Sequence, residues 1–299
     1  MPNDIEPRLM DYLKAWPQYL LPGHLLSRLM LAATRLRQPF LKDRLIRAFI
    51  RWFDVDMSQA AEADPTAYPH FNAFFTRALR PEARPVVSGP GELACPVTGT
   101  VSQLGRITDG RLFQAKGHDY GLEQLLGGQA DRAAPFHGGH FATIYLPPRA
   151  YHRIHMPLGG ALKALVHVPG RPFRVRPATP RAIPGLVARH ARVVTLFETE
   201  AGPMAVVLVG AVFVAGIETT WAGLVTPPAA RVVRRWRYEG DDAVRLGRGE
   251  ELGRFNMGST VIVLFGAGQV DWAEGLTHGT GVRMGQLLAR RTVATAPNN

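Results

Sequence analysis

The chain has 299 residues, of which 46% are hydrophobic, and its 35 Lys and Arg against 24 Asp and Glu give a formal net charge of +11. This length and apolar content exclude a disordered chain and allow one large domain with a smaller appendage. The basic charge predicts a polyanionic partner, which is either nucleic acid or an anionic lipid surface.

The beginning of the sequence lacks the features of a secretion signal, because residues 1–6 carry two acids and neither Lys nor Arg. No uncharged apolar run approaches the roughly 20 residues that span a bilayer. The single cysteine, Cys95, leaves no partner for an internal disulfide, which fits a reducing compartment, and no Cys/His cluster indicates a metal. We therefore expect no secretion, no transmembrane helix and no bound metal.

Residues 1–53 predict two or three amphipathic helices separated by Pro-containing breaks. In the last helix, apolar residues recur at helical spacing from Leu41 to Phe53. Its basic residues occupy another face: Arg44, Arg47 and Arg51. Such a helix either lies in a membrane interface or packs its apolar face on the core of its own protein.

The composition of residues 54–70 predicts a linker, and residues 71–79 predict a short helix. From about residue 93, short apolar runs bounded by Gly and Pro predict strands at 141–146, 162–168, 193–197, 204–217 and 261–265. Helices first and many strands afterwards predict an α+β fold. In this fold, N-terminal amphipathic helices precede a β-dominated catalytic domain.

A first candidate for chemistry is the pair His152 and His155, which lies between Tyr151 and Pro157. Residues three apart face opposite sides of a strand but converge in a turn. Most histidines are not catalytic. The alternative is therefore a pair of surface or hydrogen-bonded histidines.

A second candidate is Gly258-Ser259-Thr260, directly before an apolar run. Such a segment is typical of a turn that enters a strand. Chemically, a serine hydroxyl that is activated by a base attacks a carbonyl. If that carbonyl belongs to Gly258, the chain cuts itself, and glycine permits the strained backbone that this attack requires.

A third candidate consists of Gly99–Gly105 and Gln114–His118. It contains no GxGxxG or Walker pattern, and its local sequence is typical of turns and strands. With the two candidates above, it resembles the phosphatidylserine decarboxylase family in order, from about residue 45 to residue 290. The matching segments are Phe71–Arg77, Gly99–Gly105, Gln114–His118, Tyr151–Pro157, Ile217–Gly223 and Gly253–Thr260.

The resemblance implies an inactive proenzyme that cleaves itself between Gly258 and Ser259. Ser259 then becomes a covalent pyruvoyl group, and Met257 stands where the family motif has Leu. By the same resemblance, His155 is the base that takes the proton of the Ser259 hydroxyl, and His152 is the proton donor in decarboxylation. The ketone forms a Schiff base with the amine of phosphatidylserine and accepts electrons as CO2 leaves. Neither a metal nor a diffusible cofactor is needed.

The family pattern has an Asp that orients the catalytic histidine, and Thr98 stands at that position here. Threonine accepts a hydrogen bond from an imidazole but cannot neutralise an imidazolium, and in serine proteases the equivalent loss costs about 10⁴ in rate. Residues 189–193 also depart from the family pattern and lack its acid. The carboxylates considered as replacements are Asp109, Asp119 and Glu198. The alternative function is therefore a non-cleaving relative that binds anionic phospholipid.

The resemblance assigns residues 1–70 to a helical membrane-association region and linker, and residues 71–299 to the decarboxylase domain. It implies phosphatidylserine and an anionic membrane surface as partners, and a homodimer as the assembly. The expected location is peripheral, on the cytoplasmic face of the cell membrane. We expect no nucleic acid partner, because no nucleic-acid-binding motif is recognised.

Overall fold

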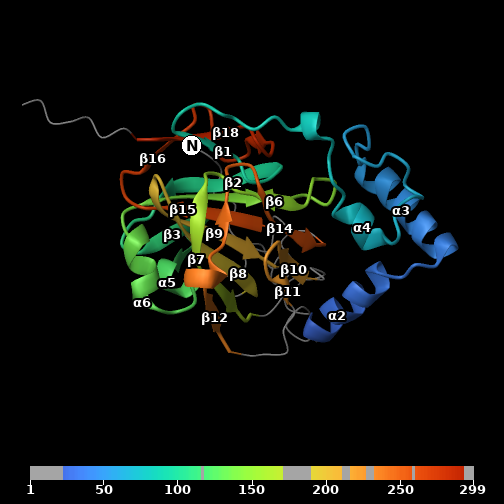
Figure 1. Ribbon diagram of the computed structural model, residues 1–299, viewed down its shortest axis with the longest axis horizontal. Helices are drawn as coiled ribbons and strands as arrows, with labels where there is room; N and C mark the ends of the chain where they lie inside the picture. The colour runs from blue at the N-terminus through green and yellow to red at the C-terminus, as the bar shows by residue number, and fades with distance from the viewer. Residues whose placement is uncertain are drawn as a thin grey trace, which may run out of the picture.

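The structure is a computed structural model that describes residues 23–115, 118–170, 190–210, 216–226, 232–257 and 260–292. In this part of the chain, helices come first and a strand-rich domain follows (Figure 1). The predicted α+β class is therefore confirmed. The predicted scissile bond between Gly258 and Ser259 and the predicted helix before residue 23 lie outside the described residues.

The N-terminal helices are α2 (Gly23–Thr34), α3 (Pro39–Phe53) and α4 (Phe71–Phe75). Proline begins α3, where its missing N–H costs nothing, and Asp54 ends α3 in the left-handed conformation. The helix predicted over 71–79 ends earlier, at Phe75: a turn follows at Thr76, and Leu79 then forms a β-bridge with Ala60.

Among the described residues, nine strands form one antiparallel sheet. In spatial order they are β12 (Arg234–Arg237), β7 (Gly160–Val168), β8 (Arg192–Thr199), β9 (Gly202–Val209), β15 (Thr260–Phe265), β5 (His140–Tyr145), β2 (Gly99–Arg106) and β17 (Gly281–Val282), with β13 (Arg245–Leu246) paired to β7. The strands predicted from the apolar runs are confirmed. The single run predicted over 204–217 covers most of β9 and the start of a second strand, β10 (Gly216–Thr219).

Three smaller sheets surround the large one. Their members are β11 (Gly223–Thr226), β10 (Gly216–Thr219), β14 (Glu251–Asn256) and β6 (Arg153–His155) in the first, β1 (Glu92–Ala94), β18 (Leu287–Arg291) and β16 (Val270–Trp272) in the second, and β3 (Arg111–Ala115) and β4 (His118–Gly121) in the third. Two short helices, α5 (Leu122–Leu125) and α6 (Ala130–Ala133), and three 3₁₀ turns (Pro81–Ala83, Ala134–Phe136 and Gly240–Asp242) complete the described elements.

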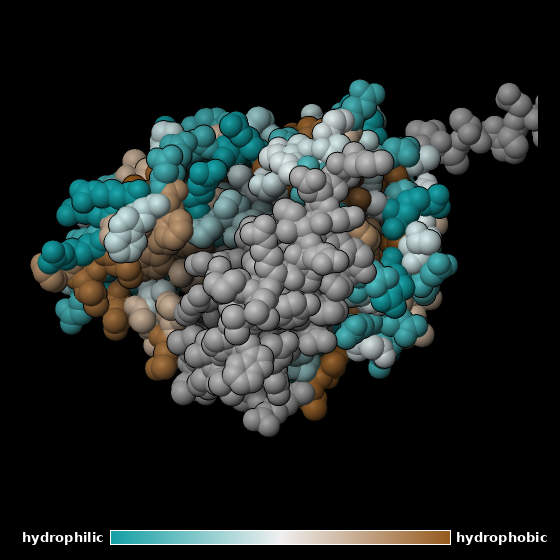
Figure 2. Space-filling model, turned by 180° about the vertical axis from the view of Figure 1, so that it is seen from behind, coloured by the Kyte–Doolittle hydropathy of each residue, from teal (hydrophilic) through white to brown (hydrophobic). Residues whose placement is uncertain are grey.

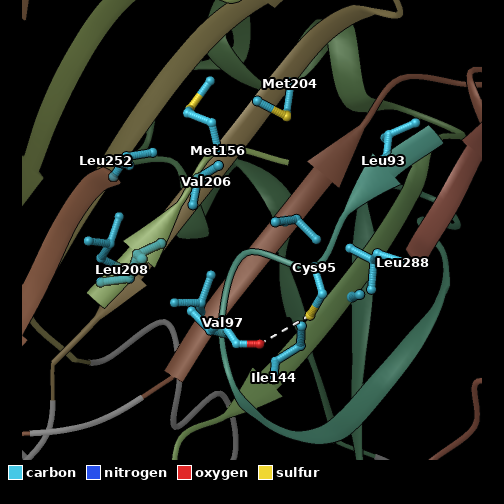
Figure 3. Close-up of a cluster of buried hydrophobic side chains, with 14 of the residues drawn as sticks. Leu93, Cys95, Val97, Ile144, Met156, Met204, Val206, Leu208, Leu252 and Leu288 are labelled. Carbon is cyan, nitrogen blue, oxygen red and sulfur yellow. Dashed lines mark hydrogen bonds between the residues drawn. The ribbon is translucent and has the colours of Figure 1, made fainter. Parts of the chain in front are cut away.

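Strand β15 is buried on both faces, which explains why its sequence is continuously apolar rather than alternating. Val261, Val263 and Phe265 join a core cluster that includes residues of β6 and β14. Ile262 and Leu264 join a second cluster under β3, β4 and the two short helices. The large sheet is therefore the middle layer of the domain, and Figure 3 shows part of the first cluster.

The N-terminal helices form a separate small core at one end of the molecule (Figure 1). Its buried members come from α3, the following linker and α4: Ile46, Phe49, Val55, Tyr68, Phe71, Phe74 and Phe75. Met257, which follows β14, packs against this cluster. The helical region is thereby joined to the strand that leads to Gly258-Ser259.

Candidate active site

The Tyr151–Pro157 segment forms the edge strand β6 and the residues around it. Strand β6 pairs antiparallel with β14, so that Ile154 lies opposite Gly253 and His155 opposite Glu251. On its other side, the His155 amide donates to the carbonyl of Pro96 at 2.9 Å. The histidine segment is therefore held between the strand that precedes Gly258-Ser259 and the segment that carries Thr98.

The His155 imidazole is partly buried and has both ring nitrogens engaged. Its Nδ1 lies 2.8 Å from the carbonyl oxygen of Gly249, and its Nε2 lies 2.9 Å from the Tyr151 hydroxyl. Because a carbonyl oxygen only accepts, Nδ1 carries the proton, and neutral Nε2 is an acceptor. Burial lowers the pKa of His155, opposed by the Gly249 hydrogen bond and the charge of Glu251. The neutral tautomer with a basic Nε2 is the form that a general base requires.

Glu251 is the carboxylate that the sequence analysis missed. It lies directly across the strand pair from His155, and its negative charge favours the imidazolium. Two arginines hold it in place: Arg153 Nη1 lies 2.8 Å from Oε2, and Arg254 Nη2 lies 2.8 Å from Oε1. Strand alternation before the Gly-Ser-Thr motif was the signal that could have identified it, but the pairing register had to be known first.

None of the three acids considered as replacements lies on β6 or on β14. Asp109 is in the turn between β2 and β3, and Asp119 forms an ion pair with Arg111 across the β3–β4 hairpin. Glu198 lies on β8, opposite Ala161 of β7. The structure places Glu251, rather than any of these, across from His155.

His152 has different surroundings from His155. Its side chain is completely buried and its ring packs on Phe75 of α4, with centroids 4.1 Å apart. Nδ1 donates to the carbonyl of Ala150 at 2.7 Å, whereas Nε2 is buried without a hydrogen-bond partner among the described residues. Burial lowers the pKa of His152 to about 3, so the ring is neutral at pH 7. An unpaired buried acceptor is costly unless a ligand or reacting group uses it.

The two histidines share no hydrogen bond or ring contact in the described part of the chain. His152 lies nearer the end of β14 that leads to Gly258, because its carbonyl accepts from the Phe255 amide at 3.0 Å. His155 lies at the other end, opposite Glu251. The described residues that flank Gly258-Ser259 are Met257 and Thr260. Thr260 begins β15 opposite Tyr145 of β5.

Thr98 lies just before β2 and directly after Val97, which belongs to the buried core (Figure 3). Its Oγ1 accepts a hydrogen bond from the Met284 amide at 3.1 Å. The next residue, Gly99, must lack a side chain, because a Cβ atom there would lie 2.2 Å from the Tyr145 carbonyl oxygen. The Nδ1 atom of His155 donates to the Gly249 carbonyl rather than to Thr98. The role of Thr98 in orienting the catalytic histidine stays a prediction.

Other groups near this region do not form a second reactive centre. Cys95 is fully buried, its Sγ contacts the Val97 carbonyl, and burial raises the pKa of its thiol to about 12 (Figure 3). Such a thiol is unreactive. Within the described ranges, no three His, Cys, Asp or Glu side chains gather as a metal site. No helix in these ranges has the length and apolar character to cross a bilayer.

Comparison with known proteins identifies relatives along almost the whole chain. A sequence model of the phosphatidylserine decarboxylase family matches residues 71–290, and a second model, described as PSD, matches residues 13–54. The relatives are named phosphatidylserine decarboxylase proenzyme. One from Ectopseudomonas mendocina is 59% identical over 91% of this chain and 95% of its own length.

Two further relatives carry the same name. The protein from Azotobacter vinelandii is 54% identical over 95% of this chain and all of its own length. The one from Bordetella bronchiseptica is 56% identical over 93% of this chain and 94% of its own length. The predicted family and enzyme class are thereby confirmed: this chain belongs to the phosphatidylserine decarboxylase family.

Proposed function

We propose that this chain is a proenzyme that cuts itself between Gly258 and Ser259 and then converts phosphatidylserine to phosphatidylethanolamine. The observation that carries the proposal is the state of His155. Its Nδ1–H is fixed by the Gly249 carbonyl, which leaves Nε2 as a proton acceptor beside the strand that leads to Ser259. A base in this tautomer takes the Ser259 hydroxyl proton, and Glu251 across the strand favours the imidazolium that forms.

The pyruvoyl group made from Ser259 would supply a ketone that withdraws electrons from the α-carbon of the lipid serine as CO2 leaves. His152 fits such a group, because its Nε2 is a buried acceptor without a partner among the described residues. At a pKa of about 3 this nitrogen carries no proton of its own at pH 7. With substrate bound, Nε2 would accept a hydrogen bond from the substrate amine, and the proton held between the two would be the one delivered to the carbon that loses CO2.

The N-terminal helices supply the proposed membrane contact. Helix α3 buries Ile46 and Phe49 but leaves Phe40 74% exposed and Trp52 78% exposed. Further exposed apolar residues lie on α2, on α3 and in the segment that joins them: Leu29, Leu36, Leu41, Leu45 and Phe53. In Figure 2 apolar side chains gather at the left edge, which is the end of the molecule formed by these helices. An exposed apolar patch of this kind marks an interaction surface.

Arginines border this apolar surface, and each basic residue near an anionic bilayer contributes about 1 kcal/mol. One side of α3 packs on the helical core, as the second alternative predicted, and other apolar residues face outward. We propose that the outward residues enter the interface of an anionic membrane. The location on the cytoplasmic face and the homodimer stay predictions.

Intact-mass measurement of the freshly purified chain tests self-cleavage. We expect two fragments divided at Gly258–Ser259, with the shorter one reacting with a carbonyl reagent, and CO2 release from phosphatidylserine. The Ser259→Ala variant is the control and should remain one chain. A wild-type chain that keeps its full mass, binds anionic vesicles and releases no CO2 would support the alternative function of a non-cleaving lipid-binding relative.

Vesicle sedimentation tests the membrane contact separately. We expect Phe40→Ser with Trp52→Ser to weaken binding to phosphatidylserine-containing vesicles by about 100-fold or more, because each buried aromatic contributes about 1.5–3 kcal/mol. Phe113→Ser is the matched control, since Phe113 is 51% exposed on the β3–β4 hairpin, far from the helices in sequence. Equal loss of binding in both variants would contradict a contact specific to α3.

A further inference from the structure

Asn256 is the last residue of β14 and precedes Gly258 by two positions. Its side chain is completely buried, and both ends of its amide are hydrogen-bonded. Nδ2 donates to Glu218 Oε1 at 2.8 Å, and Oδ1 accepts from Asn72 Nδ2 at 2.8 Å. Because the Glu218 carboxylate only accepts, it fixes the direction of both amides in this chain.

Glu218 connects the same network to the N-terminal helices. Arg35, directly after α2, lies 2.9 Å from Glu218 Oε1, and Asn72 belongs to α4. Strands β10 and β14 come close enough for this contact because Gly253 has no side chain. A Cβ atom there would lie 2.2 Å from the Glu218 carbonyl oxygen. Asn256 is thus held by a strand on one side and by a helix on the other.

Met257 adds a second restraint. Its φ of 76° lies in the left-handed region, which costs a residue with a side chain of this size a substantial amount of energy. Its side chain packs against the cluster of α3 and α4. Such strain persists where the surrounding structure over-determines the backbone. Both residues immediately before Gly258 are therefore held by contacts with the N-terminal helices.

These contacts join three of the segments that carry the family resemblance: Phe71–Arg77 through Asn72, Ile217–Gly223 through Glu218, and Gly253–Thr260 through Asn256. We infer that the chain Asn72–Asn256–Glu218 is a positioning device for self-cleavage, which fixes the backbone that enters the Gly258–Ser259 bond. The inference rests on the proposed function. It makes the helices that face the membrane a structural part of the cleavage site.

Asn256→Asp tests the device. Aspartate still accepts from Asn72, but it turns a carboxylate oxygen toward Glu218. We expect the conversion of full-length chain into two fragments to slow about 10- to 100-fold, since misplacement of a reacting bond by about 1 Å has effects of this size. Adding Glu218→Gln to Asn256→Asp supplies an amide donor to the new carboxylate. We expect this double variant to recover at least about tenfold of the lost rate.

The pH profile of cleavage separates positioning from base chemistry. Asn72→Ala should lower the rate at every pH and leave the midpoint of the profile unchanged, because it adds no titratable group and His155 keeps its partners. Arg290→Ala, which breaks the solvent-exposed ion pair with Glu92 outside this network, is the control and should change the rate by less than about fivefold. Thermal unfolding of each variant on a Ser259→Ala background establishes whether the fold is intact.

If Asn256→Asp does not fold, Asn72→Ala gives the second measurement, because it removes the donor to Asn256 from the helical side and should slow cleavage in the same way. Wild-type rates in both folded variants, or a Glu218→Gln double variant no faster than Asn256→Asp, would overturn the inference while leaving the proposed function intact. A wild-type chain that never cleaves would instead overturn the proposed function, and the inference with it.

Discussion

His152, directly before strand β6, and His155, the last residue of β6, carry the same side chain in opposite surroundings. His155, at the Glu251 end, has a partner on each ring nitrogen and lies across from a carboxylate. His152, at the Phe255 end, is completely buried with an unpartnered Nε2 among the described residues, and its ring packs on Phe75. The difference teaches that one short motif supplies two distinct proton sites. Their chemistry is set by neighbours from β14 and α4 rather than by the motif itself.

The largest expected effect comes from removing His155, the proposed base at the Glu251 end. We expect His155→Ala to slow self-cleavage by about 10²- to 10⁴-fold, which is the usual contribution of a general base. The accumulation of fragments over hours to days on a denaturing gel measures this rate.

Tyr151→Phe is the matched control for His155→Ala. It removes the hydroxyl that donates to Nε2 but leaves the Gly249 contact that fixes the tautomer. Its cleavage rate should stay within about tenfold of the wild-type rate, since one hydrogen bond to a neutral group is worth about 1 kcal/mol. A His155→Ala chain that matures at the wild-type rate would remove the distinction between the two ends of β6.

The next largest effect is expected from replacing His152, the completely buried histidine. His152→Asn keeps a donor for the Ala150 carbonyl and removes the free Nε2. We expect this variant to cleave into two fragments yet release CO2 from phosphatidylserine about 100-fold or more slowly, because it lacks the proton carrier. Mass measurement and CO2 release on the same sample separate the two steps. A variant that fails to cleave, or one whose cleaved fraction releases CO2 at the wild-type rate, would show that the roles are not divided as proposed.

The smallest expected effect is on stability in acid. The pKa of His152 is about 3 in the folded chain against an ordinary 6.5, so between these values the unfolded chain binds more protons. The contribution of His152 to the free energy of unfolding should therefore be fully present above pH 6.5, and it should decrease as the pH falls toward 3. The slope from this residue is at most about 1.4 kcal/mol per pH unit. His155, whose pKa is also lowered, acts in the same direction.

Denaturant unfolding of the Ser259→Ala chain at several pH values measures this slope, because that chain is a single species. Adding His152→Asn should flatten the profile between pH 6.5 and 4. An unchanged slope would mean that His152 is not buried as a neutral ring, and the contrast between the two ends of β6 would lose its electrostatic basis.

The sequence by itself determined the α+β class, the principal strands and the family, because these depend on local patterns and on the order of motifs. Continuous apolar runs such as residues 261–265 predict strands that are buried on both faces, and β15 has this environment. The amphipathic helix over Leu41–Phe53 was equally readable from its spacing. Which of its apolar residues face outward was not, since periodicity does not identify what a helix packs against.

Tertiary structure alone decided the partners of the functional side chains. Glu251 lies 96 positions from His155 in the sequence, and the β6–β14 register brings them face to face. Asn72 and Asn256 meet across 184 positions. The pKa of a histidine and the direction of an amide depend on such long-range neighbours and on burial. No local pattern encodes either one, because the contacts form only when distant strands and helices pack together.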